Sequence, residues 1–210
     1  MKGAFSCYHV PSHLRGGYVD VPNLSMDKLV TWVHTTPLVS SFEMNSPVID
    51  YRAEGKEARC VISMTVTFAD DARSLWDISD GAEGKGDEFA HEAKVACAAA
   101  WGASLRFFTL QSFESNWTEL KNRGAAQAIL YDGRDVNSSS LQWKIRANLA
   151  DHPLQISQLS SLTGQSYELV RLACLRMYLA GEVLIPLESQ LLSSSWMVRR
   201  ATRAAELRSS

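Results

Sequence analysis

A row of polar side chains is expected along one face of the segment Cys60–Ser79, CVISMTVTFADDARSLWDIS. In its first arm apolar and hydroxyl-bearing side chains alternate, which is the period of a half-buried strand. The turn-forming run ADDA then reverses the chain, and the return arm brings a carboxylate to the same face. The row consists of Ser63, Thr65, Thr67, Asp77 and Ser79. Its oxygen atoms are of the kind that hard cations accept as ligands, although one acid stands among hydroxyls.

The elements around this hairpin are expected to build a mixed sheet with helices packed against it, an α+β fold. Hydrophobic periodicity, caps and turn residues predict them. They are a helix over 25–32, strands over 37–43 and 48–51, the hairpin over 60–79, a helix over 87–100, a strand over 104–110 and a helix over 116–130. The hairpin would therefore lie inside the sheet, with its polar row at one of the sheet's faces.

The C-terminal third has a different pattern, three short helices followed by two strands, which is typical of a winged helix. We expect helices over 141–149, 155–162 and 166–179, and strands over 183–187 and 191–196. The polar run RDVNSSS over 134–140 lacks periodicity and is the best domain boundary. The expected division is an irregular arm (1–22), a sheet domain (23–135), a winged-helix domain (136–200) and a basic tail (201–210).

Composition favours a soluble globular chain. With 210 residues, 46% of them hydrophobic, it can bury one ordinary core and a small second one. Because no apolar run approaches the roughly 20 residues that span a bilayer, we expect a cytoplasmic protein without a membrane partner. The four cysteines form no CxxC pair, so neither a disulfide framework nor a zinc ribbon is expected. Cys7, His9 and His13 have a spacing that a metal could use, but structural zinc needs a fourth ligand.

A resemblance covers roughly residues 25–198. The run PLVSSFEMNSPVIDYR, the turn FADD, the strand and helix FFTLQSFESNWTELKNRG and the C-terminal LQISQLSSLTGQSYELVRLACLRMYLAGEVLIPLES stand in the order found in one family. The chain resembles the TnsA-type endonuclease subunit of heteromeric transposases. That family combines a restriction-endonuclease-like core with a winged-helix domain, and the resemblance implies both parts here.

The resemblance also implies an active site that this chain has largely lost. The family's hairpin Asp falls at Ser63, its Glu at Asp77 and its Lys at Ser79, and the upstream acid falls at Met26 or, with a slip of one residue, at Asp27. Mg²⁺ needs anionic oxygen ligands, and such a set would bind it weakly. We therefore expect a catalytically degenerate nuclease domain without a cofactor. Mg²⁺ would bind only if the acids Asp70, Asp71 or Asp80 had replaced the lost metal ligands.

Two further interpretations stay open for the row and for the C-terminal domain. The row can equally be the solvated face of a sheet, where Thr is common. The winged helix offers candidate DNA-contacting residues, and the alternative is a protein-docking domain with a mildly basic tail. These candidates are Gln165, Ser166, Arg171, Arg176, Arg199 and Arg200, with Trp196 and Arg203 beside them. The net charge of −2 is far from the strong basic balance typical of nucleic-acid-binding domains.

Three functions follow from these patterns. The first is a non-catalytic DNA-binding or architectural protein derived from a TnsA-like endonuclease, with duplex DNA and a transposase or AAA+ regulator subunit as partners. The second is an interaction or inhibitory protein of a mobile element or phage, which docks on a protein partner. The third is an active metal-dependent endonuclease with relocated ligands.

Overall fold

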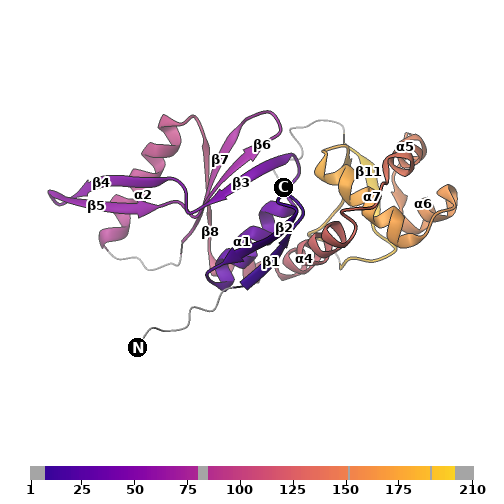
Figure 1. Cartoon of the computed structure of the whole chain (residues 1–210), viewed down its shortest axis with the longest axis horizontal. Coiled ribbons are helices and arrows are strands. Elements are labelled where there is room, and N and C mark those ends of the chain that lie inside the picture. The colour runs from indigo at the N-terminus through magenta and orange to yellow at the C-terminus, as the bar shows by residue number, and fades with distance from the viewer. Residues whose placement is uncertain (1–7, 80–84, 151, 190, 202–210) are drawn as a thin grey trace. The chain divides into compact units, whose positions relative to one another are not determined.

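The computed structural model of the chain describes residues 8–79, 85–150, 152–189 and 191–201 (Figure 1). The chain folds into two compact units. The first unit takes in residues 21–33 and 39–115, and the second takes in residues 9–20, 34–38 and 116–201. The fold is of mixed α/β character, as expected. No helix in the described ranges combines the length and the apolar character that crossing a bilayer demands.

A four-stranded mixed sheet, ordered β3-β6-β7-β8, forms the centre of the first unit. Its first three strands are antiparallel, whereas β8 runs parallel to β7 after a crossover through a helix. The elements are α1 (Leu24–His34), β3 (Val39–Met44), β6 (Met64–Phe68), β7 (Arg73–Ile78), α2 (Lys85–Ala100), β8 (Ser104–Phe108) and the short helix α3 (Leu110–Ser115). The alternation in Cys60–Ser79 thus corresponds to a real β6–β7 hairpin.

The two faces of this sheet are covered by different helices. On one face Leu75 packs with Ile62 and with Ala98 of α2. On the other face the rings of Trp76 and Phe108 lie 5.3 Å apart, and Trp32 of α1 lies 6.0 Å from Phe108. Because side chains alternate along β7, Asp77 lies on the same face as Leu75, under α2.

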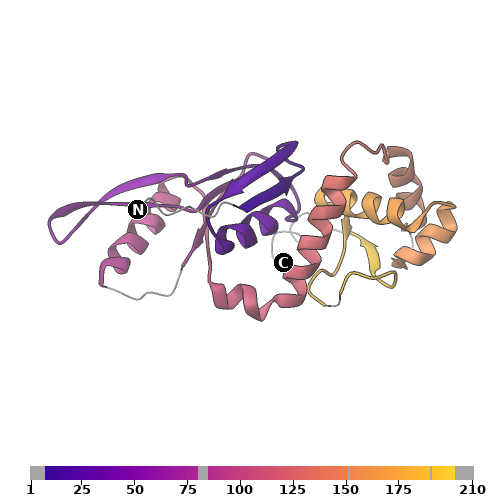
Figure 2. The ribbon, with the colours of Figure 1, turned by 60° about the horizontal axis from the view of Figure 1, so that its bottom comes forward.

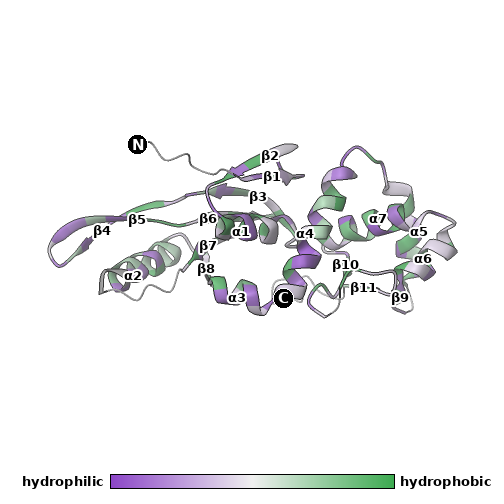
Figure 3. Cartoon of the chain, turned by 90° about the horizontal axis from the view of Figure 1, so that it is seen from below, coloured by the Kyte–Doolittle hydropathy of each residue, from purple (hydrophilic) through white to green (hydrophobic). Residues whose placement is uncertain are grey.

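A second hairpin extends from the first unit and was not expected in full. It pairs β4 (Val48–Ala53) with β5 (Lys56–Val61), turning at Gly55, whose φ is +80°. The strand β5 reads KEARCV, and its charged residues give it no apolar alternation that would predict a strand. Its exposed tip is hydrophilic (Figure 3), and Arg59 and Asp50 pair across it at 2.7 Å. The segment expected as one hairpin from Cys60 therefore begins at the end of β5.

The second unit gathers four helices and a small sheet (Figure 2). The helices are α4 (Trp117–Asp132), α5 (Ser139–Asn148), α6 (Ile156–Thr163) and α7 (Tyr167–Leu179). The sheet is ordered β10-β11-β9, with β9 (Leu154–Gln155), β10 (Val183–Leu184) and β11 (Met197–Arg200). The second strand of the wing was expected over 191–196 and lies instead at Met197–Arg200. The reason is Trp196, which is fully buried in the core and precedes the strand.

The N-terminal arm, expected to be irregular, contains a hairpin of β1 (Tyr8–Ser12) and β2 (Gly17–Val21). Its turn includes Gly16, which has a φ of +66°. Val10, Val19 and Val21 are buried. Alternating buried and exposed side chains in both strands show that the hairpin packs by one face.

The connection between α4 and α5 is tied to α7, which explains why α4 belongs to the second unit. The Arg176 guanidinium donates to the carbonyl of Gly133 at 2.6 Å and to the hydroxyl of Ser138 at 2.8 Å. A Cβ added at Gly133 would lie 2.5 Å from Leu172 of α7. The polar run over 134–140 is therefore held against a helix, and the division into units falls at Ser115 and Asn116 instead.

We expect Gly133→Ala to destabilise the second unit by about 1–3 kcal/mol, because its Cβ would overpack against the buried Leu172. Gly124→Ala on the same α4 is the matched control, since nothing lies within 4 Å of its added Cβ. That control should be neutral or gain up to about 1 kcal/mol from helix propensity. Urea unfolding followed by circular dichroism measures both, and equal midpoints for the two variants would contradict the close contact.

Candidate functional site

The polar row has Asp77 at its centre, and the structure brings Ser63 to it. The backbone N–H and the hydroxyl of Ser63 donate to one Asp77 carboxylate oxygen at 3.0 and 2.7 Å. The other oxygen accepts from the Nζ of Lys94 at 2.6 Å. Asp77 is only 3% exposed. Two positions expected to form a site thus meet, and Lys94 joins them from α2.

Lys94 is the residue that sequence reasoning missed. It lies 17 residues beyond Asp77, on α2, and its side chain is 18% exposed. Residues four apart share a helix face, so Ala90, Lys94 and Ala98 form one stripe. Because Ala98 is buried against the sheet, this stripe places the Lys94 side chain next to the sheet, where an acid can pair with it. The helical spacing was the available signal for this contact.

The rest of the row has separate local roles. Thr65 donates to the carbonyl of Ser46 at 2.7 Å, and Thr67 offers its own carbonyl to Ser40 at 3.0 Å. Ser79 is exposed, and its backbone N–H bonds to the carbonyl of Phe108 at 2.8 Å. The row is therefore neither a fully solvated face nor a five-member cluster. Its polar centre is the trio Ser63, Asp77 and Lys94, which we call the Asp77 network.

The Asp77 carboxylate is already fully engaged by protein groups. A buried carboxylate must be paired or protonated, because desolvation penalises its charge. Lys94 supplies the opposite charge, and Ser63 supplies two donors, while the Ser63 hydroxyl itself accepts from the N–H of Ile78 at 3.1 Å. A cation could bind Asp77 only by displacing the Lys94 ammonium, so this arrangement favours a structural role.

The upstream acid Asp27 lies on α1, the helix that covers the opposite face of the sheet through Trp32. Burial raises the pKa of Asp27, and the charge of Lys28 lowers it by a smaller amount. Met26 beside it is a core residue at 5% exposure. Within the ranges that the structure describes, no three His, Cys, Asp or Glu side chains gather closely enough to hold a metal ion.

The proposed substitute acids lie elsewhere. Asp70 and Asp71 form the β6–β7 turn, where Asp70 accepts from the N–H of Ala72 at 3.3 Å and Asp71 has a φ of +62°. That turn closes the far end of the hairpin from Ser63 and Asp77. Asp80 lies outside the described residues. The turn acids are therefore placed as turn-forming residues, away from the Asp77 network.

The N-terminal residues whose spacing could suit a metal do not form a site in the described part of the structure. His9 is exposed and pairs with Asp20 at 2.6 Å. His13 turns inward, and its ring lies 5.3 Å from that of His34. Cys7 lies outside the described residues. His34 is held by the Ser12 hydroxyl at 2.7 Å. This pair of imidazoles belongs to the interior of the second unit.

The residues expected to contact DNA are not gathered on one surface. Much of α7 itself is buried, namely Val170, Leu172, Ala173, Cys174, Leu175, Met177 and Tyr178. Arg176 binds the α4–α5 connection, and Ser166 caps α7 by accepting from the N–H of Leu169 at 3.3 Å. These buried positions leave the exposed surface of α7 mainly at its first turn, where the acid Glu168 is exposed. The candidate recognition helix thus contributes much of the core of its unit.

The remaining candidates point in several directions. Gln165 is exposed before α7, and Arg171 stacks over the ring of Tyr167 at 5.2 Å. Arg199 and Arg200 are both exposed but adjacent on β11, so their side chains leave opposite faces of the strand. Trp196 is a core residue, and Arg203 lies outside the described residues.

Removing Lys94 should destabilise the first unit, because it would leave Asp77 buried and unpaired. We expect Lys94→Met to cost about 2–4 kcal/mol. The double variant Asp77→Asn with Lys94→Met should recover part of that loss, since no uncompensated charge remains. Thermal and urea unfolding measure both variants and the single Asp77→Asn, with the exposed Lys121→Met as a matched control. Additive effects of the two substitutions would show that the residues do not interact in solution.

The second unit should lose stability in mild acid because of His13. Burial, with a smaller contribution from the Arg176 charge, lowers the pKa of His13 from 6.5 to about 4. The folded state therefore disfavours the proton that the unfolded state accepts, so stability is full above pH 6.5 and falls between pH 6.5 and 4. The loss is on the order of 2–3 kcal/mol.

Urea unfolding at several pH values checks this, using His13→Gln and the exposed His152→Gln as a matched pair. His13→Gln should flatten the dependence between pH 6.5 and 4, because Gln does not titrate. His152→Gln should keep the wild-type dependence. A steep acid loss that persists in His13→Gln would assign the effect to another group.

Comparison with known proteins adds no identity: no protein-family model matches this chain, and no curated protein matches it.

Proposed function

We propose that this chain is a non-catalytic interaction protein, built on a TnsA-like nuclease fold that no longer carries out nuclease chemistry. The observation that carries the proposal is the Asp77 network. The acid at the expected active-site position is bonded to Lys94 and Ser63 and is almost completely buried. Such a carboxylate stabilises the fold and is not free to hold a metal ion.

The fold of the first unit supports the restriction-endonuclease-like part of the proposal. The unit has a mixed sheet with α1 and α2 on opposite faces, and the β6–β7 hairpin lies at its centre. Ser63 and Asp77, aligned with the family's two hairpin acids, lie within 2.7 Å of each other. Two positions that the resemblance pairs are thus neighbours in space, as an active site would require.

The chemistry of these positions argues against cleavage. Hydrolysis of a phosphodiester by Mg²⁺ uses the ion to neutralise charge and to activate water, and several anionic ligands hold it. Here one position holds a hydroxyl, and the single carboxylate is neutralised by Lys94. A charge-balanced protein network therefore stands at the position of the expected metal ligands.

The second unit supports docking on a protein. Its element order, α5, β9, α6, α7, β10 and β11, is consistent with a winged helix. Since most of α7 is buried and Arg176 is engaged, the small sheet and the segments around it are a more accessible surface for a partner than α7. The resemblance makes a transposase or an AAA+ regulator the first partner classes to test, with a phage or mobile-element target as the alternative.

Duplex DNA is the second candidate partner, favoured by the exposed Arg199 and Arg200 on β11. Phosphate contacts by these residues would make the affinity fall steeply with salt. Their opposite directions on the strand and the acid Glu168 at the exposed start of α7 limit such contacts to a few. We therefore rank docking on a protein above DNA binding.

Supercoiled plasmid incubated with the full chain and Mg²⁺ or Mn²⁺ tests the proposal. We expect no nicking by the wild type and no change in Asp77→Ala. The triple variant Ser63→Asp, Asp77→Glu and Ser79→Lys should gain affinity for Mn²⁺ in calorimetry, because it restores acids at the family's positions.

Metal-dependent nicking by the wild type that Asp77→Ala abolishes would overturn the proposal. In parallel, fluorescence anisotropy with a labelled DNA duplex at rising salt separates the two partner classes. Weak binding with a shallow salt dependence is expected for a protein-docking unit. A steep dependence that Arg200→Gln reduces would favour DNA.

A further inference from the structure

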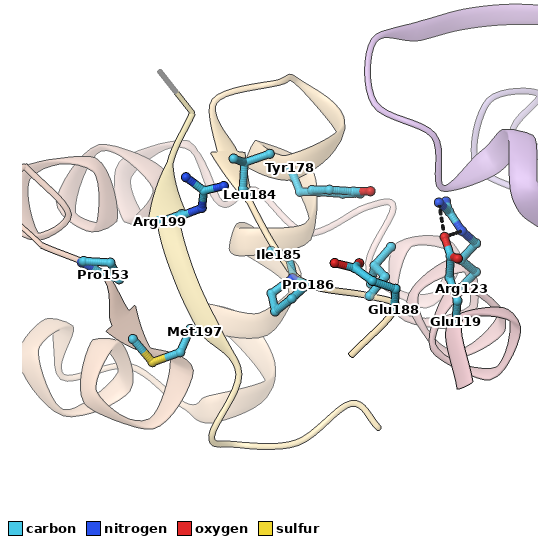
Figure 4. Close-up of a pocket in the computed structure, with 11 residues that line it drawn as sticks. Glu119, Arg123, Pro153, Tyr178, Leu184, Ile185, Pro186, Glu188, Met197 and Arg199 are labelled. Atoms are coloured by element: carbon cyan, nitrogen blue, oxygen red, sulfur yellow. Dashed lines mark hydrogen bonds and ion pairs between the residues drawn. The ribbon is translucent and has the colours of Figure 1, made fainter. Parts of the chain in front are cut away.

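A cavity of about 470 Å³ lies within the second unit, and no step of the proposed function has used it. Its walls come from α4, the end of α7, β10 with the segment after it, and β11 (Figure 4). The volume is in the range of sites that bind small molecules or short peptide segments. All of its lining residues belong to one compact unit, so the cavity does not depend on how the two units are placed.

The middle of the cavity is apolar. Leu184, Ile185 and Pro186 line it from β10 and the segment that follows, and Met197 lines it from β11 (Figure 4). Side chains of this kind bind apolar groups by removing them from water, without fixing their direction. The orientation of a bound ligand must therefore be set by polar groups at the ends of the cavity.

One end of the cavity carries excess negative charge. Glu119 pairs with Arg123 at 2.6 Å, and Arg123 also donates to the carbonyl of Thr35 at 2.9 Å, so this arginine is fully engaged. Glu188 adds a second carboxylate on the same side, facing Tyr178 (Figure 4). Burial raises the pKa of Tyr178. The charge of Arg123 lowers this pKa, and the charges of Glu119 and Glu188 raise it. Two acids and one base give this end a net charge of −1.

Arg199 supplies the opposite charge away from that end. It lies opposite Leu184 in the β10–β11 register, and Figure 4 shows it beside Leu184, with Ile185 and Pro186 between it and Glu188. Glu188 and Arg199 are exposed, and within the described part of the chain neither forms an ion pair with the other or with another residue. An apolar stretch is thus flanked by an available cation and an available anion.

We propose that this cavity binds an extended peptide segment of a protein partner, apolar in its middle, with an acidic side chain for Arg199 and a basic side chain for Glu188. The inference rests on the proposed interaction role and names its site and partner chemistry. Charge complementarity selects this occupant. A nucleic acid would meet the two carboxylates Glu119 and Glu188, and a purely apolar ligand would leave both end charges unused.

Calorimetry with the full chain and three capped pentapeptides tests the proposal. The probes are Ac-Glu-Leu-Val-Leu-Lys-NH2, and the two versions that carry Glu at both ends or Lys at both ends. The mixed peptide should bind most tightly, and each same-charge peptide should bind at least about fivefold more weakly. Reversing the sequence of the mixed peptide is not a useful control, since a reversed chain can bind in the opposite direction.

The decisive variant is Glu188→Lys, which leaves cations at both ends of the cavity. It should lower the affinity for the mixed peptide about tenfold. The peptide with Glu at both ends should then bind most tightly of the three. Glu168→Lys is the matched control, because Glu168 is an exposed acid in the first turn of α7 that does not line the cavity. It should leave the order of the three peptides unchanged.

Three outcomes would overturn the proposal. They are absence of binding of the mixed peptide at 1 mM (on the order of −4 kcal/mol), an unchanged peptide order in Glu188→Lys, and equal heats from the peptide and from its free amino acids. The plasmid assay depends on Asp77 in the other unit, so failure of peptide binding and failure of the proposed non-catalytic role are observed separately.

Discussion

The buried carboxylate of Asp77 imposes the main constraint on the first unit. An isolated charge in that position would be costly, so partners must come to it from the surrounding elements. Lys94 comes from α2 and Ser63 from the start of β6, and together they tie a helix to the central hairpin. The apolar contact between α2 and the sheet is small, with Ala98 as the described residue of α2 that is buried in it. The ion pair therefore adds a specific polar contact to the apolar packing that places α2 on the sheet.

The second unit meets a different constraint, because a single helix lies at its centre. The helix α7 contributes most of its residues to the core, and Arg176 binds three carbonyls and one hydroxyl of the segment after α4. A helix used in this way stabilises the unit but has little surface to offer a ligand. The proposed recognition would instead use shorter elements at the edge, where β10, β11 and the cavity beside them combine apolar side chains with exposed charges.

Local sequence patterns predict most helices and strands, but they do not predict contacts between residues that are distant in sequence. Alternation indicates the β6–β7 hairpin, and the position of Ser166 before an apolar helical run indicates the cap of α7. The strand β5 is not predicted, because it carries charged residues and its pairing with β4 depends on backbone hydrogen bonds. The second wing strand is predicted too early because Trp196 resembles a strand residue but packs in the core. Lys94 escapes because its partner lies 17 residues earlier, on a strand of the sheet that α2 covers.

The three residues of the Asp77 network fit one another in a way that bears on the proposed loss of nuclease chemistry. Replacing Ser63 by an acid would bring two carboxylates to within hydrogen-bonding distance, and one ammonium could not neutralise both. Such a pair is stable when a divalent cation lies between its oxygens. Ser63 removes that need, since its hydroxyl donates to Asp77 and accepts from Ile78. Serine at 63, aspartate at 77 and lysine at 94 are therefore one self-consistent set, in which the buried carboxylate is satisfied by protein groups.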